Sequence, residues 1–436
     1  RLLSRGLGDV YKRQDSTFFQ NIIAIGCCSA SNGFGSQDGN GGLAIGTCAA
    51  RFATANILAI GANAGCQSSG SQNAFVGVNA GLKNTSGCCN SFFGQQTGQQ
   101  NTTGCCNTFI GSGAASGNTT GGANISLGMC SGPQSLGASG CHNFIGGFKS
   151  GSSLTSGSCN ILVGLCAGLS ITSGINNVAI GLLAGTNTGI GSENVFIGSC
   201  TGLCNTEGRC NVFIGKYAGK CNTVGSYNVA IGDRAGCCLR TGCTGVLIGL
   251  AAGMKLCSGN SNIFIGNQTG ICASTACENV IMGTVAGKAL SSGVNNVALG
   301  KMSGCKLNNG SNNVLLGNCS GYCLTGNDNV MLGMNSGFHR SGNKYCRNVL
   351  VGKSAGDNAT TLAVDNFDVL IGFTAGLDYT GSCSIGIGHS VNLPINDGMN
   401  QLAIGQHNNN WIVGDCNYNV GIGTTKPIAK LDVNVG

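Results

Sequence analysis

The feature that most constrains this chain is a short motif that recurs with a fixed period. The motif is Asn-Val-x-Ile-Gly, followed by two variable residues, a small residue and usually a second glycine. Its first glycine recurs every 17 residues, at Gly164, Gly181, Gly198, Gly215, Gly232, Gly249, Gly266, Gly283, Gly300 and Gly317. A period of this length, kept over consecutive copies, predicts a solenoid in which each repeat forms one turn, or rung, stacked on its neighbours.

Composition supports a solenoid and excludes other fold classes. Glycine occupies 78 of 436 positions, charged residues make up 8% of the chain, and apolar residues make up 42%. Glycine without a three-residue period excludes collagen, and this apolar content is too high for a disordered chain. We therefore predict an all-β fold, a parallel β-solenoid (β-roll) of about two dozen rungs of about 17 residues.

The repeat does not extend to either end of the chain. Residues 1–14, RLLSRGLGDVYKRQ, share nothing with it and resemble translated sequencing-adaptor tails of assembled environmental sequences, so we set them outside the fold. We expect a repeat shaft at 15–376, an irregular transition at 377–418 and a neck segment at 419–436. Trp411 lies in the transition, where we expect it to be buried rather than to stack on a sugar.

One column of the repeat is occupied mainly by asparagine, four residues before the glycine. Its members include Asn177, Asn194, Asn211, Asn228, Asn262, Asn279, Asn296 and Asn313. Identical amides that repeat about every 4.8 Å in stacked strands can hydrogen-bond to one another as a ladder. We interpret the column as a structural corner, with a metal or glycan site as the alternative.

The three residues between the asparagine and the glycine are all apolar. Because side chains alternate along a strand, Val195 and Ile197 face one way and Phe196 faces the other. A strand that is apolar on both faces indicates burial on both faces. We expect the middle column to contact the same column of another copy, so we predict a homo-oligomer with this strand near its axis.

Two stretches resemble known families. The sequence Asn-Val-Ala-Ile-Gly at 228–232, followed by a small residue at Ala235, resembles the head repeats of trimeric autotransporter adhesins, which form left-handed parallel β-rolls packed as trimers. The segment from Asn419 to Val433 is similar to a segment of phage and viral tail-fibre proteins that often precedes an intramolecular chaperone of the endosialidase type. That chaperone is absent from this sequence, so no catalytic residue of it is assigned here.

The resemblance implies a function of display rather than chemistry. It implies a structural fibre shaft of a phage or virus, homotrimeric, placed on the virion or extracellular surface, and carrying regions that attach to a host-surface glycan or protein receptor. The alternatives are a cellular surface adhesin of the trimeric autotransporter type and a structural extracellular filament.

Twenty-eight cysteines depart from both families. They fall in columns of the repeat instead of the paired spacing of zinc sites. The candidate disulfide columns hold Cys88, Cys89, Cys105, Cys106, Cys204, Cys210, Cys221, Cys238, Cys243, Cys272 and Cys277. Disulfides that staple a fibre in an oxidising exterior, reduced thiols packed as small apolar residues and metal ligands remain open.

No pattern of residues points to catalysis. The four histidines are scattered, acidic residues number 15, and the glycine-rich pieces do not precede helices as phosphate loops do. The formal charge of +7 includes a net +3 from residues 1–14, so no basic patch indicates nucleic acid. We predict that the chain is not an enzyme and has no cofactor, no metal, no nucleic-acid partner and no membrane insertion.

Overall fold

The structure is a computed structural model of the whole chain. It describes residues 10–11, 22–31, 41–53, 56–338, 346–357, 367–377, 379–395, 397–407 and 409–434. Within these residues the fold is all-β, with no helix, and forms a parallel β-solenoid of about 21 turns with rungs of about 17 residues. The predicted fold class is therefore confirmed, with slightly fewer rungs than expected.

The described strands belong to two compact units. The first comprises residues 1–217 and 222–224, and the second comprises residues 218–221 and 225–436. Strands of the first unit are β1 (Val10–Tyr11), β2 (Ile22–Ile25), β3 (Gly42–Ile45), β4 (Ile57–Ile60), β5 (Asn73–Val76), β6 (Ser91–Phe93), β7 (Thr108–Ile110), β8 (Ile125–Leu127), β9 (Phe144–Gly146), β10 (Ile161–Val163), β11 (Val178–Ile180), β12 (Val195–Ile197) and β13 (Val212–Ile214).

Strands of the second unit are β14 (Val229–Ile231), β15 (Val246–Ile248), β16 (Ile263–Ile265), β17 (Val280–Met282), β18 (Val297–Leu299), β19 (Val314–Leu316), β20 (Val330–Leu332), β21 (Val349–Val351), β22 (Val369–Ile371), β23 (Ile385–Ile387), β24 (Leu402–Gln406), β25 (Asn409–Gly414), β26 (Val420–Ile422) and β27 (Leu431–Val433).

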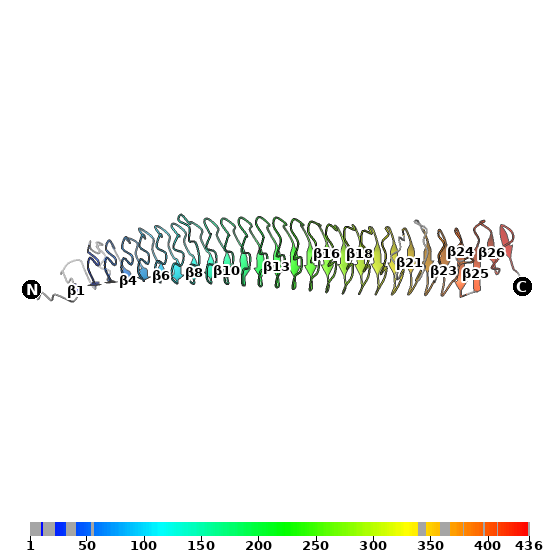
Figure 1. Cartoon of the computed structure of the whole chain (residues 1–436), viewed down its shortest axis with the longest axis horizontal. Coiled ribbons are helices and arrows are strands. Elements are labelled where there is room, and N and C mark those ends of the chain that lie inside the picture. The colour runs from blue at the N-terminus through cyan, green and yellow to red at the C-terminus, as the bar shows by residue number, and fades with distance from the viewer. Residues whose placement is uncertain are drawn as a thin grey trace, which may run out of the picture. The chain divides into compact units, whose positions relative to one another are not determined.

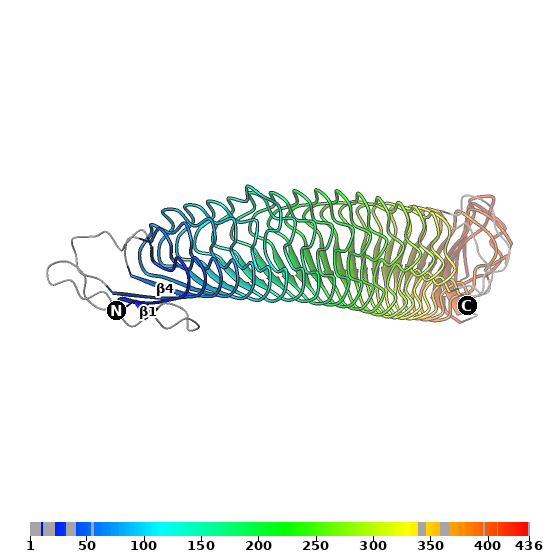
Figure 2. The ribbon, with the colours of Figure 1, turned by 60° about the vertical axis from the view of Figure 1, so that its left-hand side comes forward.

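Each turn of the chain contributes one short strand to a parallel ladder (Figure 1). In the first unit β2 to β13 pair in sequence order and in register, so that Val195 lies beside Val178 and Val212. Figure 2 shows the strands of consecutive turns side by side, with the arcs that connect them completing each turn. In-register stacking places equivalent residues of every repeat in a column, which explains why the sequence repeats so regularly.

The pairing of the strands changes from parallel to antiparallel near the C-terminal end of the second unit. Strands β14 to β24 continue the parallel pairing, so β23 and β24 extend the solenoid into the segment that we expected to be irregular (377–418). Strand β25 then pairs antiparallel with both β24 and β26, and β27 pairs parallel with β26. The described part of the 419–436 segment thus completes the sheet.

The first residues of the chain take a small part in the fold. Residues Val10–Tyr11, inside the segment 1–14 that we set aside, form β1 and pair antiparallel with β2. The rest of residues 1–14 lies outside the described residues.

The core of each rung is filled by the middle residue of its strand. Phe196 and Phe213 are fully buried, and their ring centroids lie 5.6 Å apart. Phe92 and Phe109 are buried in the same column, with centroids at 4.7 Å. Our expectation that the middle column contacts a second copy is therefore wrong, because this column packs inside one chain. The flanking residues, such as Ile197 at 37% exposure, form the outward face.

Two glycines make the turn after the strand possible. Gly198 has a φ of 130°, and a Cβ on it would lie 2.9 Å from the carbonyl group of Gly215 in the next rung. Gly202 has a φ of 55°, and a Cβ on it would lie 2.6 Å from the ring of Phe196. The first glycine lets neighbouring backbones approach, and the second lets the chain pass over the core phenylalanine.

Candidate functional site

The asparagine column forms a ladder of buried amides over consecutive rungs. The Asn194 side-chain amide donates to Asn177 Oδ1 at 3.1 Å and to the Gly208 carbonyl at 2.9 Å. The Asn194 backbone N–H also donates to Asn177 Oδ1, at 3.1 Å. Each amide therefore bonds to the rung before it and to the rung after it. Because these side chains are fully buried, the ladder is a structural corner and offers no exposed ligand.

The other predicted members of the ladder behave in the same way. Amide-to-amide hydrogen bonds of 2.9–3.1 Å join Asn194 to Asn211, Asn262 to Asn279, Asn279 to Asn296, and Asn296 to Asn313. At Asn228 the acceptor oxygen instead receives the backbone N–H of Gly245, at 2.9 Å. Because Gly245 has no side-chain amide, the side-chain ladder is interrupted there.

A carboxylic acid occupies the ladder position in one rung. Asp368 is 5% exposed; its backbone N–H donates to Asn348 Oδ1 at 2.8 Å, and its Oδ1 accepts the Ser384 N–H at 2.9 Å. Burial raises the pKa of the Asp368 carboxyl to about 7, although the Ser384 N–H acts in the opposite direction. Tyr379 lies nearby, and burial raises the pKa of its phenol to about 12.

A second asparagine ladder was missed in the sequence. Asn101 donates to Asn84 Oδ1 at 2.6 Å, and Asn118 donates to Asn101 Oδ1 at 2.7 Å. The 17-residue spacing of these three asparagines was the available signal. This ladder lies beside the first one, because Asn107 and Asn118 both donate to the Gly121 carbonyl. The ladder stops at Asn118, because the next rung brings Ala138 beside it. The Oδ1 atom of Asn118 has no hydrogen-bond partner among the protein atoms.

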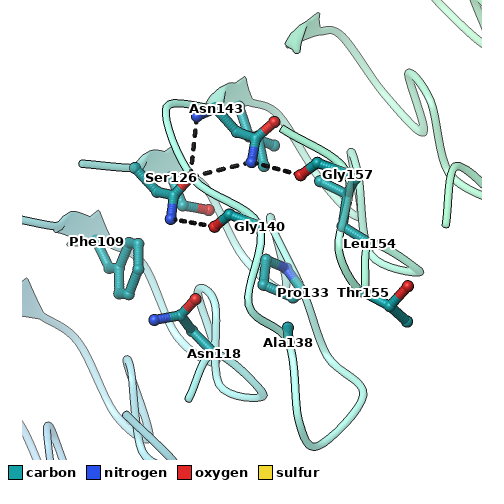
Figure 3. Close-up of a pocket in the computed structure, with 12 residues that line it drawn as sticks. Phe109, Asn118, Ser126, Pro133, Ala138, Gly140, Asn143, Leu154, Thr155 and Gly157 are labelled. Carbon is teal, nitrogen blue, oxygen red and sulfur yellow. Dashed lines mark hydrogen bonds between the residues drawn. The ribbon is translucent and has the colours of Figure 1, made fainter. Parts of the chain in front are cut away.

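A small cavity lies where this second ladder stops (Figure 3). Ser126 occupies the core position that Phe109 and Ile145 fill in the adjacent rungs, and its shorter side chain leaves the space. The cavity measures about 10 Å³, which is room for one water at most. It is therefore a packing defect rather than a binding site for an organic ligand.

One cysteine column has a defined hydrogen-bonding role. It lies two residues before the asparagine ladder, and its side chain accepts a backbone N–H from the preceding rung. The acceptor is Cys141 for Gly122 at 3.3 Å, Cys243 for Ser226 at 3.5 Å and Cys277 for Asn260 at 3.4 Å. Ser158 and Ser192 accept in the same way in other rungs. In these rungs a thiol performs the task of a hydroxyl.

Among the candidate disulfide columns, the structure brings two sulfur atoms together at Cys88 and Cys105. Their sulfurs are 3.0 Å apart. The neighbouring Cys89 and Cys106 are both exposed, and the Cys89 thiol donates to Gln72 Oε1 at 3.2 Å. The Cys210 thiol donates to Glu193 Oε2 at 3.1 Å.

The remaining candidate cysteines lie on the arcs. Cys221 and Cys238 belong to the second unit, whereas Cys204 belongs to the first. Burial raises the pKa of the Cys238 thiol, and the nearby Cys221 raises it further. Cys272 is partly buried, and its backbone N–H donates to the Lys288 carbonyl at 3.1 Å. These thiols on the arcs are all partly buried.

The outward side of the strands carries exposed apolar side chains on many rungs. We call the following set in the first unit the outward apolar face: Val78, Phe93, Ile110, Ile125, Met129, Phe144, Phe148, Ile161, Leu165, Ile180, Leu182 and Ile197. Each is between 36% and 52% exposed, and each is a flanking strand residue or follows the first glycine. A row of exposed apolar side chains on consecutive rungs indicates an interaction surface.

Aromatic side chains are also exposed in the last strands of the second unit. Trp411 in β25 is 62% exposed and Tyr418 is 71% exposed. The expectation that Trp411 is buried is therefore wrong, because the antiparallel turn from β24 to β25 places its side chain outside the core. Phe373 and His389 stack nearby in sequence, with ring centroids at 5.1 Å.

The described residues hold no group of three or more histidine, cysteine, aspartate or glutamate side chains that could bind a metal ion. They also hold no helix that is long and apolar enough to cross a membrane.

Comparisons with protein-family models, with curated proteins and with solved structures found no match to this chain.

Proposed function

We propose that this chain is the structural shaft of a phage or viral fibre, assembled from three copies of the chain and placed on the virion or extracellular surface. In this fibre the polar arcs display regions that attach to a host-surface glycan or protein. The observation that carries the proposal is the outward apolar face. It continues over consecutive rungs of the first unit, and the described residues of one chain leave it exposed.

The regularity of this face favours a second and third copy of the same chain as its partners. Flanking side chains such as Ile180 and Ile197 repeat with the stacking period of the strands, at about 4.8 Å. A partner that fills such a surface continuously needs the same period. Another copy of the solenoid has it, and side chains from the two copies can then interdigitate rung by rung.

The arcs have the opposite character and suit exposure to solvent. Hydroxyl groups there bond to the carbonyl of the next rung, as Thr155 does to Thr172 at 3.1 Å. This bonding fixes the backbone of the arc through a short hydroxyl side chain. Neighbouring arcs can therefore differ in sequence while the rungs keep their spacing, which a display surface requires.

The test compares two matched pairs of substitutions. Ile180→Lys with Ile197→Lys places charges on the outward apolar face, where the side chains are 39% and 37% exposed. Ile175→Lys with Ile190→Lys places the same charges on arcs, where they are 42% and 46% exposed. We expect the first variant to lose the trimer in sedimentation velocity and the second to keep it. Equal assembly of both variants would exclude this face as the interface.

The viral assignment needs a separate test. Antibodies raised against the purified chain are expected to label appendages of virus particles in immunogold electron microscopy. Labelling confined to cell surfaces would contradict the viral assignment and favour a cellular adhesin or filament.

A further inference from the structure

We propose that Cys88 and Cys105 form an intrachain disulfide that covalently joins two consecutive rungs, and that they are the pair that a small-molecule disulfide oxidises first. This inference goes beyond the fibre proposal and does not depend on it. It selects one pair from the several candidate cysteine columns, on the geometry of the side chains.

The two sulfurs are held close together by the stacking of their rungs. Cys88 and Cys105 are 17 residues apart, occupy the same column, and have sulfurs 3.0 Å apart. Stacked neighbours have Cα atoms about 4.8 Å apart, inside the range of about 4.4–6.8 Å that disulfides span. Bond formation therefore needs a small rotation of the two side chains rather than movement of the backbone.

The position of the Cys105 sulfur is fixed by hydrogen bonds. It accepts the Cys88 backbone N–H at 3.1 Å, and its thiol points to the Thr103 carbonyl at 3.4 Å. The same pair of bonds holds the Ser158 hydroxyl, which accepts the Cys141 N–H at 3.0 Å and donates to Ser156 at 3.2 Å. The thiol is thus already placed for reaction before any oxidant arrives.

The packing of the column does not require two adjacent thiols. Serine, asparagine and cysteine all serve as the acceptor in this column, as at Ser192, Asn260 and Cys277. Along the 17-residue repeat, Cys88 and Cys105 are consecutive members that both carry sulfur. A hydrogen-bond acceptor alone therefore does not account for the pair, whereas a covalent link needs two thiols in neighbouring rungs.

The pair is also accessible to a small oxidant. Both cysteines are free thiols and only partly buried, so a small oxidant can reach them. The hydrogen bond to Cys105 is the main cause that raises the pKa of the Cys88 thiol to about 12. Cys88 therefore keeps its proton at neutral pH.

The reaction is a double thiol–disulfide exchange. The thiolate of one of the two cysteines attacks a small-molecule disulfide, which forms a mixed disulfide and releases one small thiolate. The sulfur of the other cysteine then attacks the protein sulfur of the mixed disulfide, loses its proton to solvent and releases the second small thiolate. The protein loses two electrons and two protons, and the oxidant becomes two thiols. The link closes a loop between rungs and restricts the unfolded chain.

The test maps the disulfide in the full chain. The chain is incubated with oxidised glutathione at neutral pH, the remaining thiols are alkylated, and the protein is cut with chymotrypsin, which cleaves after Phe92 or Phe93 and separates the two cysteines. We expect a linked peptide pair containing Cys88 and Cys105. A link between Cys89 and Cys106, or mixed disulfides with glutathione alone, would overturn the proposal.

Matched variants and isotope labelling complete the test. Cys88→Ser keeps a side chain that the column accepts elsewhere, so it should preserve the circular dichroism spectrum and lose the linked peptide. Cys89→Ser should keep the linked peptide. When isotope-labelled and unlabelled chains are mixed before folding, linked peptides should carry a single label. Links between differently labelled peptides would instead show a bond between chains and overturn the intrachain assignment.

Discussion

At the scale of single residues, the buried amides of the asparagine ladder hold one rung on the next. Asn194 donates three hydrogen bonds to the rungs before and after it, and its Oδ1 accepts two more from Asn211. A buried polar group that loses its partner costs about 1–3 kcal/mol. The ladder therefore makes the stacking of rungs specific as well as favourable, because a rung out of register would leave several such groups without partners.

Replacing one ladder amide tests this role. We expect Asn194→Ala to lower the free energy of unfolding by about 2–4 kcal/mol, because the side-chain bonds to Asn177 and Gly208 are lost in a buried site. Asn187→Ala, on the exposed arc of the same region, is the control and should change it by less than about 0.5 kcal/mol. Urea denaturation measures both, and equal midpoints would contradict the assigned role.

Asp368 makes one rung sensitive to pH. The pKa of its carboxyl is about 7 in the folded chain and about 3.9 when unfolded. Between these values the folded state holds a proton that the unfolded state releases, so stability is highest at acidic pH and is lost as pH rises from about 4 to about 7. The protonated acid can donate a hydrogen bond as asparagine does, whereas the carboxylate is a buried charge.

The matching prediction concerns Asp368→Asn. This variant should remove the pH dependence that arises from the carboxyl, and should stabilise the chain at pH 8 by roughly 2–4 kcal/mol relative to the parent chain. Urea denaturation of both chains at pH 5 and pH 8 isolates the effect as a difference. The same pH dependence in the two chains would show that Asp368 is not its source.

At the scale of the strand and its turn, the middle side chain decides the stability of a rung. Phe196 is fully buried and packs on Phe213. We expect Phe196→Ala to cost about 3–5 kcal/mol through the cavity that it leaves. Phe196→Leu should cost less, because Leu247 and Leu315 fill the same column in other rungs. Thermal unfolding followed by circular dichroism measures the two midpoints, and equal midpoints for the two variants would contradict this order.

The strand also marks the limit of what could be predicted from the sequence. The constant period predicts the rung, its strand and the asparagine corner, because in-register stacking forces equivalent residues into columns. Which side chains of the strand point into the core of the chain could not be predicted in the same way. Val195, Phe196 and Ile197 are all apolar, so no polar residue marks the outward face, and the middle column was wrongly assigned to contact with a second copy.

The candidate cysteine pairs show a second limit. Cys88 with Cys105 and Cys89 with Cys106 have identical spacing in the sequence. The backbone at Cys89 and Cys106 has a positive φ, of 57° and 61°, and these two thiols are exposed, whereas the sulfurs of Cys88 and Cys105 are in contact. Spacing predicts that residues share a column, and only side-chain direction decides which of them can bond.

At the scale of the whole molecule, the proposed fibre depends on association between copies of the chain. A solenoid gains stability between neighbouring rungs, and the described rungs bury their middle column without help from another chain. The flanking columns remain exposed in the single chain. A protein of this kind is expected to associate through these columns, since contiguous exposed apolar surface is otherwise a cause of aggregation.

Assembly through the outward apolar face can be tested by measuring the solution mass of the full chain by light scattering, with and without reductant. We predict a mass of three times the 43.5 kDa chain in both conditions, because the apolar face rather than disulfides holds the copies together. A trimer that dissociates on reduction would show that disulfides, and not the apolar face, hold the copies together. A soluble single chain in both conditions would contradict the fibre proposal itself.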